Sequence, residues 1–269
     1  MGKERIDMIF REKLAAKEKL FVPYMMAGDG GLDTLEEKIA FLEKCGVSAI
    51  ELGIPFSDPI ADGPVIQQAG IRALESGTTL ASVLEKLSVI RKKYTVPIIL
   101  MSYINPIFQY GIEKFARDCF ASGVDGVIIP DIPMEEEGII SPHLAAYGIA
   151  CIRLAAMTSP PDRIKKIAER TEGFLYAVSV MGTTGARNAY AENISAYLRQ
   201  LKENSPVPVL AGFGVSSGKQ ARYLSQYCDG VIVGSKIVDL FFKGKREEIK
   251  RLIESSLSGE PLTEKVKFP

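Results

Sequence analysis

Two acidic residues mark the point where an apolar run of the sequence gives way to a loop. Glu51 lies within the apolar run 49–55, and Asp62 lies in the turn-rich stretch 56–64 that follows. A carboxylate in a buried strand is costly unless it is neutralised or paired, so it is typical of a site that needs an acid of unusual proton affinity. Asp62 can face the same space from the loop. The pair therefore predicts acid–base chemistry by two carboxyl groups.

The overall composition excludes several classes of protein. The chain has 269 residues, 46% of them hydrophobic, which is enough for a large core. Lys+Arg and Asp+Glu are both 33, so we expect neither a nucleic acid nor a membrane as a partner. The first residues lack a signal-peptide core, and no apolar run is long enough to cross a bilayer. The four cysteines fit no zinc or redox spacing, and we expect reduced thiols in a soluble cytoplasmic protein: Cys45, Cys119, Cys151 and Cys228.

Short Val/Ile/Leu-rich runs alternate with longer amphipathic segments along the whole chain. Their near-continuous apolarity favours parallel strands covered on both faces. The predicted strands are 20–27, 48–54, 97–103, 126–131, 150–155, 174–180, 207–212 and 230–234. Eight strand–helix units without a break in composition predict one α/β domain over residues 1–269, a (β/α)8 TIM barrel, with an open doubly wound sheet as the alternative.

Glycine-bearing turns follow the later strands, at the end of a barrel where active sites lie. The turn 212–214 is followed by Val215, and the turn Gly234-Ser235 opens a short segment that reads as an extra helix. Such turns let backbone N–H groups approach an anion, so they predict a phosphate site, although each turn alone is also compatible with a merely tight connection. The segment 181–188 reads either as a lid over the ligand or as an ordinary connection.

The residues that are missing narrow the chemistry further. His143 is the one histidine, and no lysine lies in the apolar run of a predicted strand, so neither a zinc aldolase nor a Schiff-base lysine is expected, and no metal site is predicted. Asp131 follows the fourth strand, where it can tether a neighbouring loop or cap the next helix, and we favour such a support role. Carbon–carbon cleavage would then need an electron sink in the substrate, such as a ring that can be protonated at carbon.

The segment 51–67 resembles the signature of tryptophan synthase alpha chains. The resemblance continues in order through 21–24, 28–29, 101–106, 130–133, 182–185, 212–214 and 234–235. It implies a TIM barrel with an extra N-terminal helix and a short phosphate-binding helix after strand eight. It also implies the reversible retro-aldol cleavage of indole-3-glycerol phosphate to indole and glyceraldehyde 3-phosphate, in which indole C3 is protonated.

The resemblance also implies roles for individual residues. Glu51 would be the general acid at C3, and Asp62 would accept a hydrogen bond from the indole N–H. The phosphate would meet Gly185, Gly214, Gly234 and Ser235. The indole and glycerol pocket would be lined by Tyr24, Ile66, Met101, Tyr103, Ile128, Leu154, Tyr176, Thr184 and Phe213. Many members of the family have Phe at the place of Tyr24, so this wall is expected to be more polar here.

The family works as an alpha2-beta2 heterotetramer, whose beta chain carries pyridoxal phosphate, so the resemblance implies no cofactor in this chain. The expected contacts with the beta chain include Asp58, Pro59 and Asn105. Two rival functions remain open at this stage. One is a phosphosugar isomerase that shares the phosphate turns, and the other is a non-catalytic phosphate-binding barrel that only activates a partner.

Overall fold

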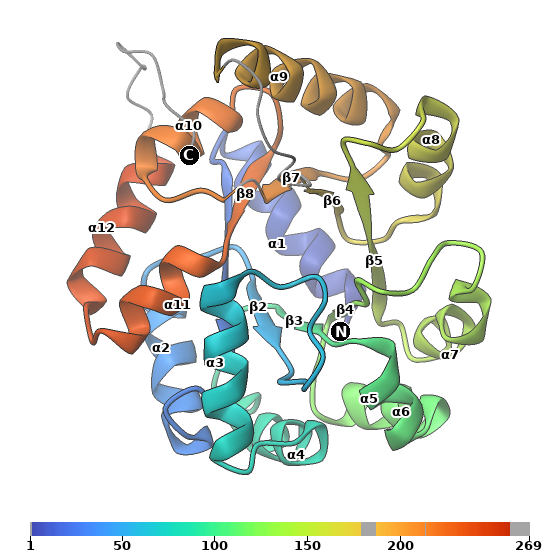
Figure 1. Cartoon of the computed structure of the whole chain (residues 1–269), viewed down its shortest axis with the longest axis vertical. Coiled ribbons are helices and arrows are strands. Elements are labelled where there is room, and N and C mark those ends of the chain that lie inside the picture. Colours follow the sequence, from blue (N-terminus) through green and yellow to red (C-terminus); the bar gives the residue numbers. More distant parts are fainter. Residues whose placement is uncertain (1, 179–186, 213, 259–269) are drawn as a thin grey trace.

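The computed structural model describes residues 2–178, 187–212 and 214–258, and it contains a closed barrel of parallel strands in the order β1 to β8 (Figure 1). The strands are β1 (Leu20–Met26), β2 (Ile50–Gly53), β3 (Ile98–Met101), β4 (Gly126–Ile128), β5 (Ala150–Ala156), β6 (Leu175–Val178), β7 (Val209–Gly212) and β8 (Gly230–Val233). The barrel closes where β1 pairs with β8, for example Phe21 with Val231. The predicted TIM barrel is confirmed, and each strand lies within or close to its predicted range.

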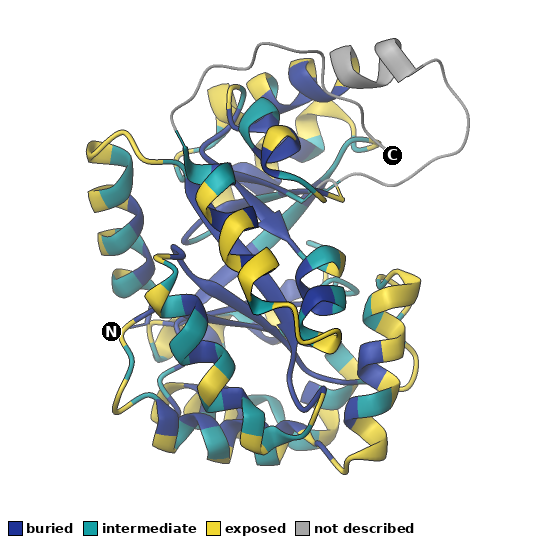
Figure 2. Ribbon diagram, turned by 90° about the vertical axis from the view of Figure 1, so that its left-hand side faces the viewer, coloured by how far each residue is buried: buried dark blue, intermediate teal, exposed yellow. Residues whose placement is uncertain are grey.

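Helices surround this barrel, and most connections between strands carry one or two of them. They are α1 (Lys3–Ala15), α2 (Leu35–Lys44), α3 (Pro64–Glu75), α4 (Leu80–Ile90), α5 (Ile104–Tyr110), α6 (Ile112–Ala121), α7 (Ser141–Ala146), α8 (Pro161–Arg170), α9 (Arg187–Asn204), α10 (Gly218–Leu224), α11 (Ser235–Phe242) and α12 (Arg246–Leu257). The expected extra helices are present, α1 before the first strand and α11 after the last. Figure 2 shows buried strands inside and helices whose exposed faces point outward.

Side chains along each strand alternate between the helices and the barrel interior, as the period of two in a strand requires. In β1, Leu20 and Val22 belong to an interior cluster together with Ile99 of β3 and Ile128 of β4. Residues at intervening positions pack instead against the surrounding helices. Glu51 pairs in register with Tyr24 and with Ile99. It therefore lies on the interior face of β2, and the loop that carries Asp62 follows the carboxyl end of this strand.

The helix α1 closes the amino end of the barrel. Its Ile6 and Phe10 side chains are buried and belong to the interior cluster, and the Phe10 ring lies 6.0 Å from that of Phe174 between centroids. Arg5 on the same helix pairs with the fully buried Asp125 at 3.1 Å. In Figure 1, α1 lies at the centre of the ring of helices.

Three strands begin with the same kind of contact. The side chains of Ser48, Asp125 and Asp229 accept hydrogen bonds from backbone N–H groups of a neighbouring strand, at 3.1, 3.0 and 2.9 Å. These residues lie just before β2, β4 and β8, where a short turn connects a helix to the strand. These side-chain contacts therefore hold the amino ends of the three strands, on the side of the barrel opposite the loop that carries Asp62.

Candidate functional site

Glu51 is a buried carboxyl group at the mouth of the barrel. Its residue is 2% exposed, and one carboxyl oxygen, Oε2, has no hydrogen-bond partner among the described residues. Burial raises the pKa of Glu51 to about 8, and the nearby charge of Asp62 adds to this rise. The desolvated carboxyl group therefore holds its proton at neutral pH, so it can donate that proton to a bound molecule.

Asp62 reaches the same region from the loop between β2 and α3. Burial raises its pKa to about 6, while hydrogen bonding to the Tyr103 hydroxyl acts in the opposite direction. The same hydroxyl accepts a hydrogen bond from the backbone N–H of Ala61 at 2.9 Å, and the Tyr103 ring lies 5.4 Å from that of Phe56. Tyr103 therefore fixes both ends of the loop that carries Asp62. At pH 7 Asp62 is mainly a carboxylate while Glu51 is mainly an acid.

An apolar wall surrounds these two carboxyl groups. Tyr24, Ile66 and Met101 pack in one cluster, and Met101 also contacts the interior cluster that contains Ile128 and two partly buried residues, Leu154 and Tyr176. All six were expected to line a pocket, and they come from β1, β3, β4, β5, β6 and α3. The two clusters share Met101, and Tyr24 and Tyr176 lie close enough to Glu51 and Asp62 for these carboxyl groups to raise the pKa values of both tyrosines.

The glycine turns lie beside this wall. Gly234 follows β8, and a Cβ built on it would lie 3.5 Å from Ile66 Cδ1 and 3.8 Å from Tyr24 Cβ. Ser235 is the first residue of α11, whose initial N–H groups have no partner within the helix and favour an anion. Gly214 follows the adjacent strand β7 with a φ of +64°, a conformation that glycine adopts readily. The turns after neighbouring strands can therefore hold an anionic group at the edge of the apolar wall.

Three predicted site residues, Thr184, Gly185 and Phe213, lie outside the described residues, as does most of the segment 181–188 that reads as a lid or a connection. Asp131 is described, and its Oδ1 accepts a hydrogen bond from the backbone N–H of Ile104 at 3.0 Å. This contact joins the loop after β4 to the first residue of α5.

The residues expected to face a partner are accessible. Asp58 and Asn105 are exposed, and Pro59 is half-buried. Two large apolar side chains lie close to them in sequence, Ile60 at 83% exposed and Phe108 at 51% exposed. Both side chains are therefore available for apolar contacts on the surface of the protein.

One connection at the mouth was not predicted from the sequence. Arg72 of α3 holds the buried Asp29, after β1, with two hydrogen bonds of 2.7 and 2.9 Å. The same guanidinium lies over the ring of Phe242, 4.1 Å from its centroid, at the end of α11. The helix that follows Asp62 is therefore joined to the helix that begins at Ser235. The only signal in the sequence is an Arg and an Asp 43 residues apart, which does not identify a pair.

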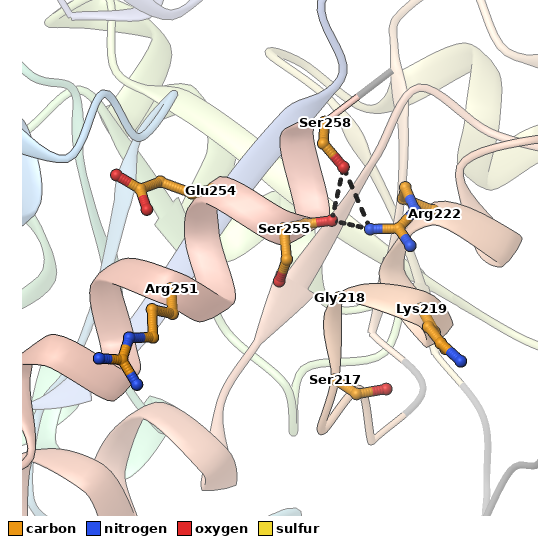
Figure 3. A pocket seen from close by; sticks show the side chains of 8 residues that line it. All are labelled: Ser217, Gly218, Lys219, Arg222, Arg251, Glu254, Ser255 and Ser258. Atoms are coloured by element: carbon orange, nitrogen blue, oxygen red, sulfur yellow. Dashed lines mark hydrogen bonds between the residues drawn. The ribbon is translucent and has the colours of Figure 1, made fainter. Parts of the chain in front are cut away.

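A separate surface depression lies between α10 and α12 and has a volume of about 710 Å³ (Figure 3). It is lined by Ser217, Gly218, Lys219, Arg222, Arg251, Glu254, Ser255 and Ser258. None of these residues belongs to the mouth described above, and Arg222 is bound to Ser258 Oγ at 3.2 Å.

Cysteine pairing, metal binding and membrane spans can also be examined in the described residues. All four cysteines are free thiols, and three of them are buried. No group of three or more His, Cys, Asp or Glu residues in the described ranges could hold a metal ion. Among the same residues, no helix is long and apolar enough to span a bilayer.

Comparisons with known proteins agree on one family. The family model for the tryptophan synthase alpha chain matches residues 10–267. A tryptophan synthase alpha chain of Oceanobacillus iheyensis is 58% identical over 257 residues, which cover 96% of this chain and 98% of that protein. One from Bacillus anthracis is 47% identical over 260 residues, which cover 97% and 99%. The crystal structure of tryptophan synthase subunit alpha from Legionella pneumophila superposes with a TM-score of 0.85 at 33% identity, covering 95% of this chain and 97% of that one.

Proposed function

The chain belongs to the tryptophan synthase alpha chain family, and on this premise we propose that Glu51 transfers the protons of its reaction and that Asp62 stabilises the positive charge that forms. The reaction is the cleavage of indole-3-glycerol phosphate to indole and glyceraldehyde 3-phosphate in tryptophan biosynthesis. The subunit is a lyase that needs no cofactor of its own. It works with a beta chain, to which pyridoxal phosphate belongs.

The observation that carries this proposal is the deep burial of Glu51 close to Asp62, a second carboxyl group that is only half-buried. The pKa of Glu51 is raised to about 8 and that of Asp62 to about 6. Between these values Glu51 is an acid and Asp62 is an anion. Such a separation lets one carboxyl group act as the acid while the other, already ionised, stabilises a positive charge that forms nearby.

The two groups then divide the chemistry. Glu51 donates its proton to C3 of the indole ring, and the resulting indolenine carries positive charge on nitrogen. Asp62 accepts the hydrogen bond of that N–H and stabilises the charge. The hydroxyl of the glycerol chain loses its proton to Glu51, the bond between C3 and the glycerol carbon breaks, and its electrons restore the aromatic ring. Indole and the aldehyde then leave, and Glu51 is again protonated because it has given one proton to C3 and received one from the hydroxyl.

The remaining residues bind and orient the substrate. We infer that Gly214, Gly234 and Ser235 hold the phosphate, with Gly185 added from the family resemblance. The flat indole fits the apolar wall of Tyr24, Ile66, Met101, Ile128, Leu154 and Tyr176, to which the resemblance adds Phe213 and Thr184. Tyr103 and Asp131 fix the loops at the mouth, because each accepts a backbone N–H.

We propose that the face containing Asp58, Pro59 and Asn105 binds the beta chain, since the exposed Ile60 and Phe108 supply apolar area there. We also infer one domain over residues 1–269, because a single closed barrel takes its strands from residue 20 to residue 233. A cytoplasmic location is inferred from the biosynthetic role of the family.

The test is indole release from indole-3-glycerol phosphate by the purified chain, with and without a beta chain, across pH 5 to 9. We expect kcat/KM to fall below about pH 6, where Asp62 becomes protonated, and above about pH 8, where Glu51 loses its proton. A flat profile between pH 5 and 9, or activity that persists in Glu51→Gln, would remove the assigned pair.

A further inference from the structure

The hydroxyl of Tyr24 is a buried donor without a strong acceptor. Tyr24 is 3% exposed, and its hydroxyl contacts only the thioether sulfur of Met26, at 4.0 Å, among the hydrogen bonds of the described residues. Sulfur is a weak acceptor, so this contact compensates little of the loss of water. Next to it in the barrel, Glu51 has the opposite deficit, because its Oε2 is buried and accepts no hydrogen bond from the described residues.

The strands direct this hydroxyl toward the acidic groups. Tyr24 pairs in register with Glu51, so both side chains enter the barrel interior side by side. A Cβ built on Gly53 would lie only 2.0 Å from the Tyr24 hydroxyl oxygen. Gly53 is two residues beyond Glu51 on the same face of β2, so the absence of a side chain there makes room for the hydroxyl above Glu51.

Among the described residues, the titratable groups that influence this hydroxyl are carboxyl groups and phenols, with no cation among them. They are Glu51 of β2, Asp62 of the following loop, Tyr103 after β3 and Tyr176 of β6. Burial, followed by these groups, raises the pKa of Tyr24 well above its usual range. Tyr24 therefore stays a neutral phenol, able to donate a hydrogen bond, at every pH at which the two carboxyl groups change state.

We propose that Tyr24 is a positioning residue that donates a hydrogen bond to the Glu51 carboxylate as this group gives up its proton. The inference rests on the proposed function of Glu51 as the acid. While Glu51 is protonated, the hydroxyl has little to stabilise. Once the proton has moved to the substrate, a buried carboxylate remains, and a hydrogen bond to a charged group is about twice as strong as one between neutral groups. The hydroxyl thus stabilises the charge that forms during the reaction.

The substitution Tyr24→Phe removes this donor and keeps the ring. We expect kcat at pH 7 to fall about tenfold, with KM within about twofold, because the lost bond matters only when Glu51 is ionised. The alkaline limb of the kcat profile, set by Glu51, should move upward by about one pH unit, the equivalent of a tenfold change. The isolated chain and its complex with a beta chain should show the same shift.

The matched control is Met26→Leu, which removes the present contact of the hydroxyl and keeps the hydroxyl itself. We expect it to leave kcat and the alkaline limb unchanged, whereas an equal effect of both substitutions would make Tyr24 a packing residue and overturn the inference. A rise in KM alone in Tyr24→Phe, or an unmoved alkaline limb, would overturn it as well. Failure of the wild-type chain to release indole would instead refute the proposed function.

Discussion

The substitution Glu51→Gln should give the protein a stability advantage over wild type that grows as the pH rises, and it should strongly slow the reaction. In the unfolded chain, Glu51 ionises around its ordinary pKa of 4.5, and in the folded chain at about 8. Between these values the folded state binds one more proton than the unfolded state, so stability decreases as pH increases. This penalty is absent below 4.5, grows throughout the interval and is complete above 8.

The expected size follows from the width of this interval. From pH 5 to pH 7 the penalty on the wild-type protein grows by about 1.4 kcal/mol per pH unit, or about 3 kcal/mol in total. The glutamine variant has no such ionisation, so its advantage in free energy of unfolding should widen by about 3 kcal/mol over the same range. Any constant effect of the amide on packing cancels when the two pH values are compared. Cleavage should fall by about 10² to 10⁴, the usual contribution of a general acid.

The assay is urea unfolding of both proteins at pH 5 and pH 7, together with indole release. Glu75→Gln, at an exposed carboxyl group of α3, is the control and should show a constant difference from wild type. A gap between wild type and Glu51→Gln that is the same at both pH values would mean that Glu51 ionises as readily in the fold as in the unfolded chain. That result would refute its assignment as an acid at neutral pH.

Three further substitutions test other parts of the mouth. Asp62→Asn should lower kcat by about 10² to 10³ and remove the acid limb near pH 6, with no loss of melting temperature, whereas a collapsed melting transition would make Asp62 structural. Gly234→Asp should raise KM for the substrate at least tenfold, because its charge repels the phosphate. Gly234→Ala should raise KM less, because its added Cβ meets only ordinary contacts. Equal KM values for the two variants would place the phosphate elsewhere. Arg72→Leu should lower the free energy of unfolding in urea by about 3 kcal/mol, because it leaves the side chain of Asp29 buried without its partner. Adding Asp29→Asn to the same chain should recover most of that loss, and no recovery would show that the pair is unimportant.

Much of the fold was predictable from the sequence because parallel strands are nearly continuous apolar runs. The limits of the strands were less accurate. The run 97–103 reads as one strand, but β3 ends at Met101 and Tyr103 already precedes the first turn of α5. Apolar and aromatic residues continue past the last strand pairing, so hydrophobicity alone does not mark where the ladder ends.

The acid at the site was predictable for the opposite reason. Glu51 interrupts an apolar run, and a charge in such a place is conspicuous. The connection from Arg72 to Asp29 and the space that Gly53 leaves for Tyr24 were not predictable, because each depends on which residues of different elements meet in three dimensions. The glycine turns predicted a phosphate site, but by themselves they were equally compatible with a phosphosugar isomerase. Only the family signature distinguished that reaction from the cleavage of indole-3-glycerol phosphate.

Because α1 closes the amino end of the barrel, it limits the routes by which substrate and products can enter and leave. Because Ile6 and Phe10 fill the amino end, the interior of the described barrel is closed on that side. Substrate and products are therefore expected to enter and leave at the carboxyl end, where the loop with the exposed Ile60 lies. A partner that docks on this loop can decide where released indole goes without touching either carboxyl group.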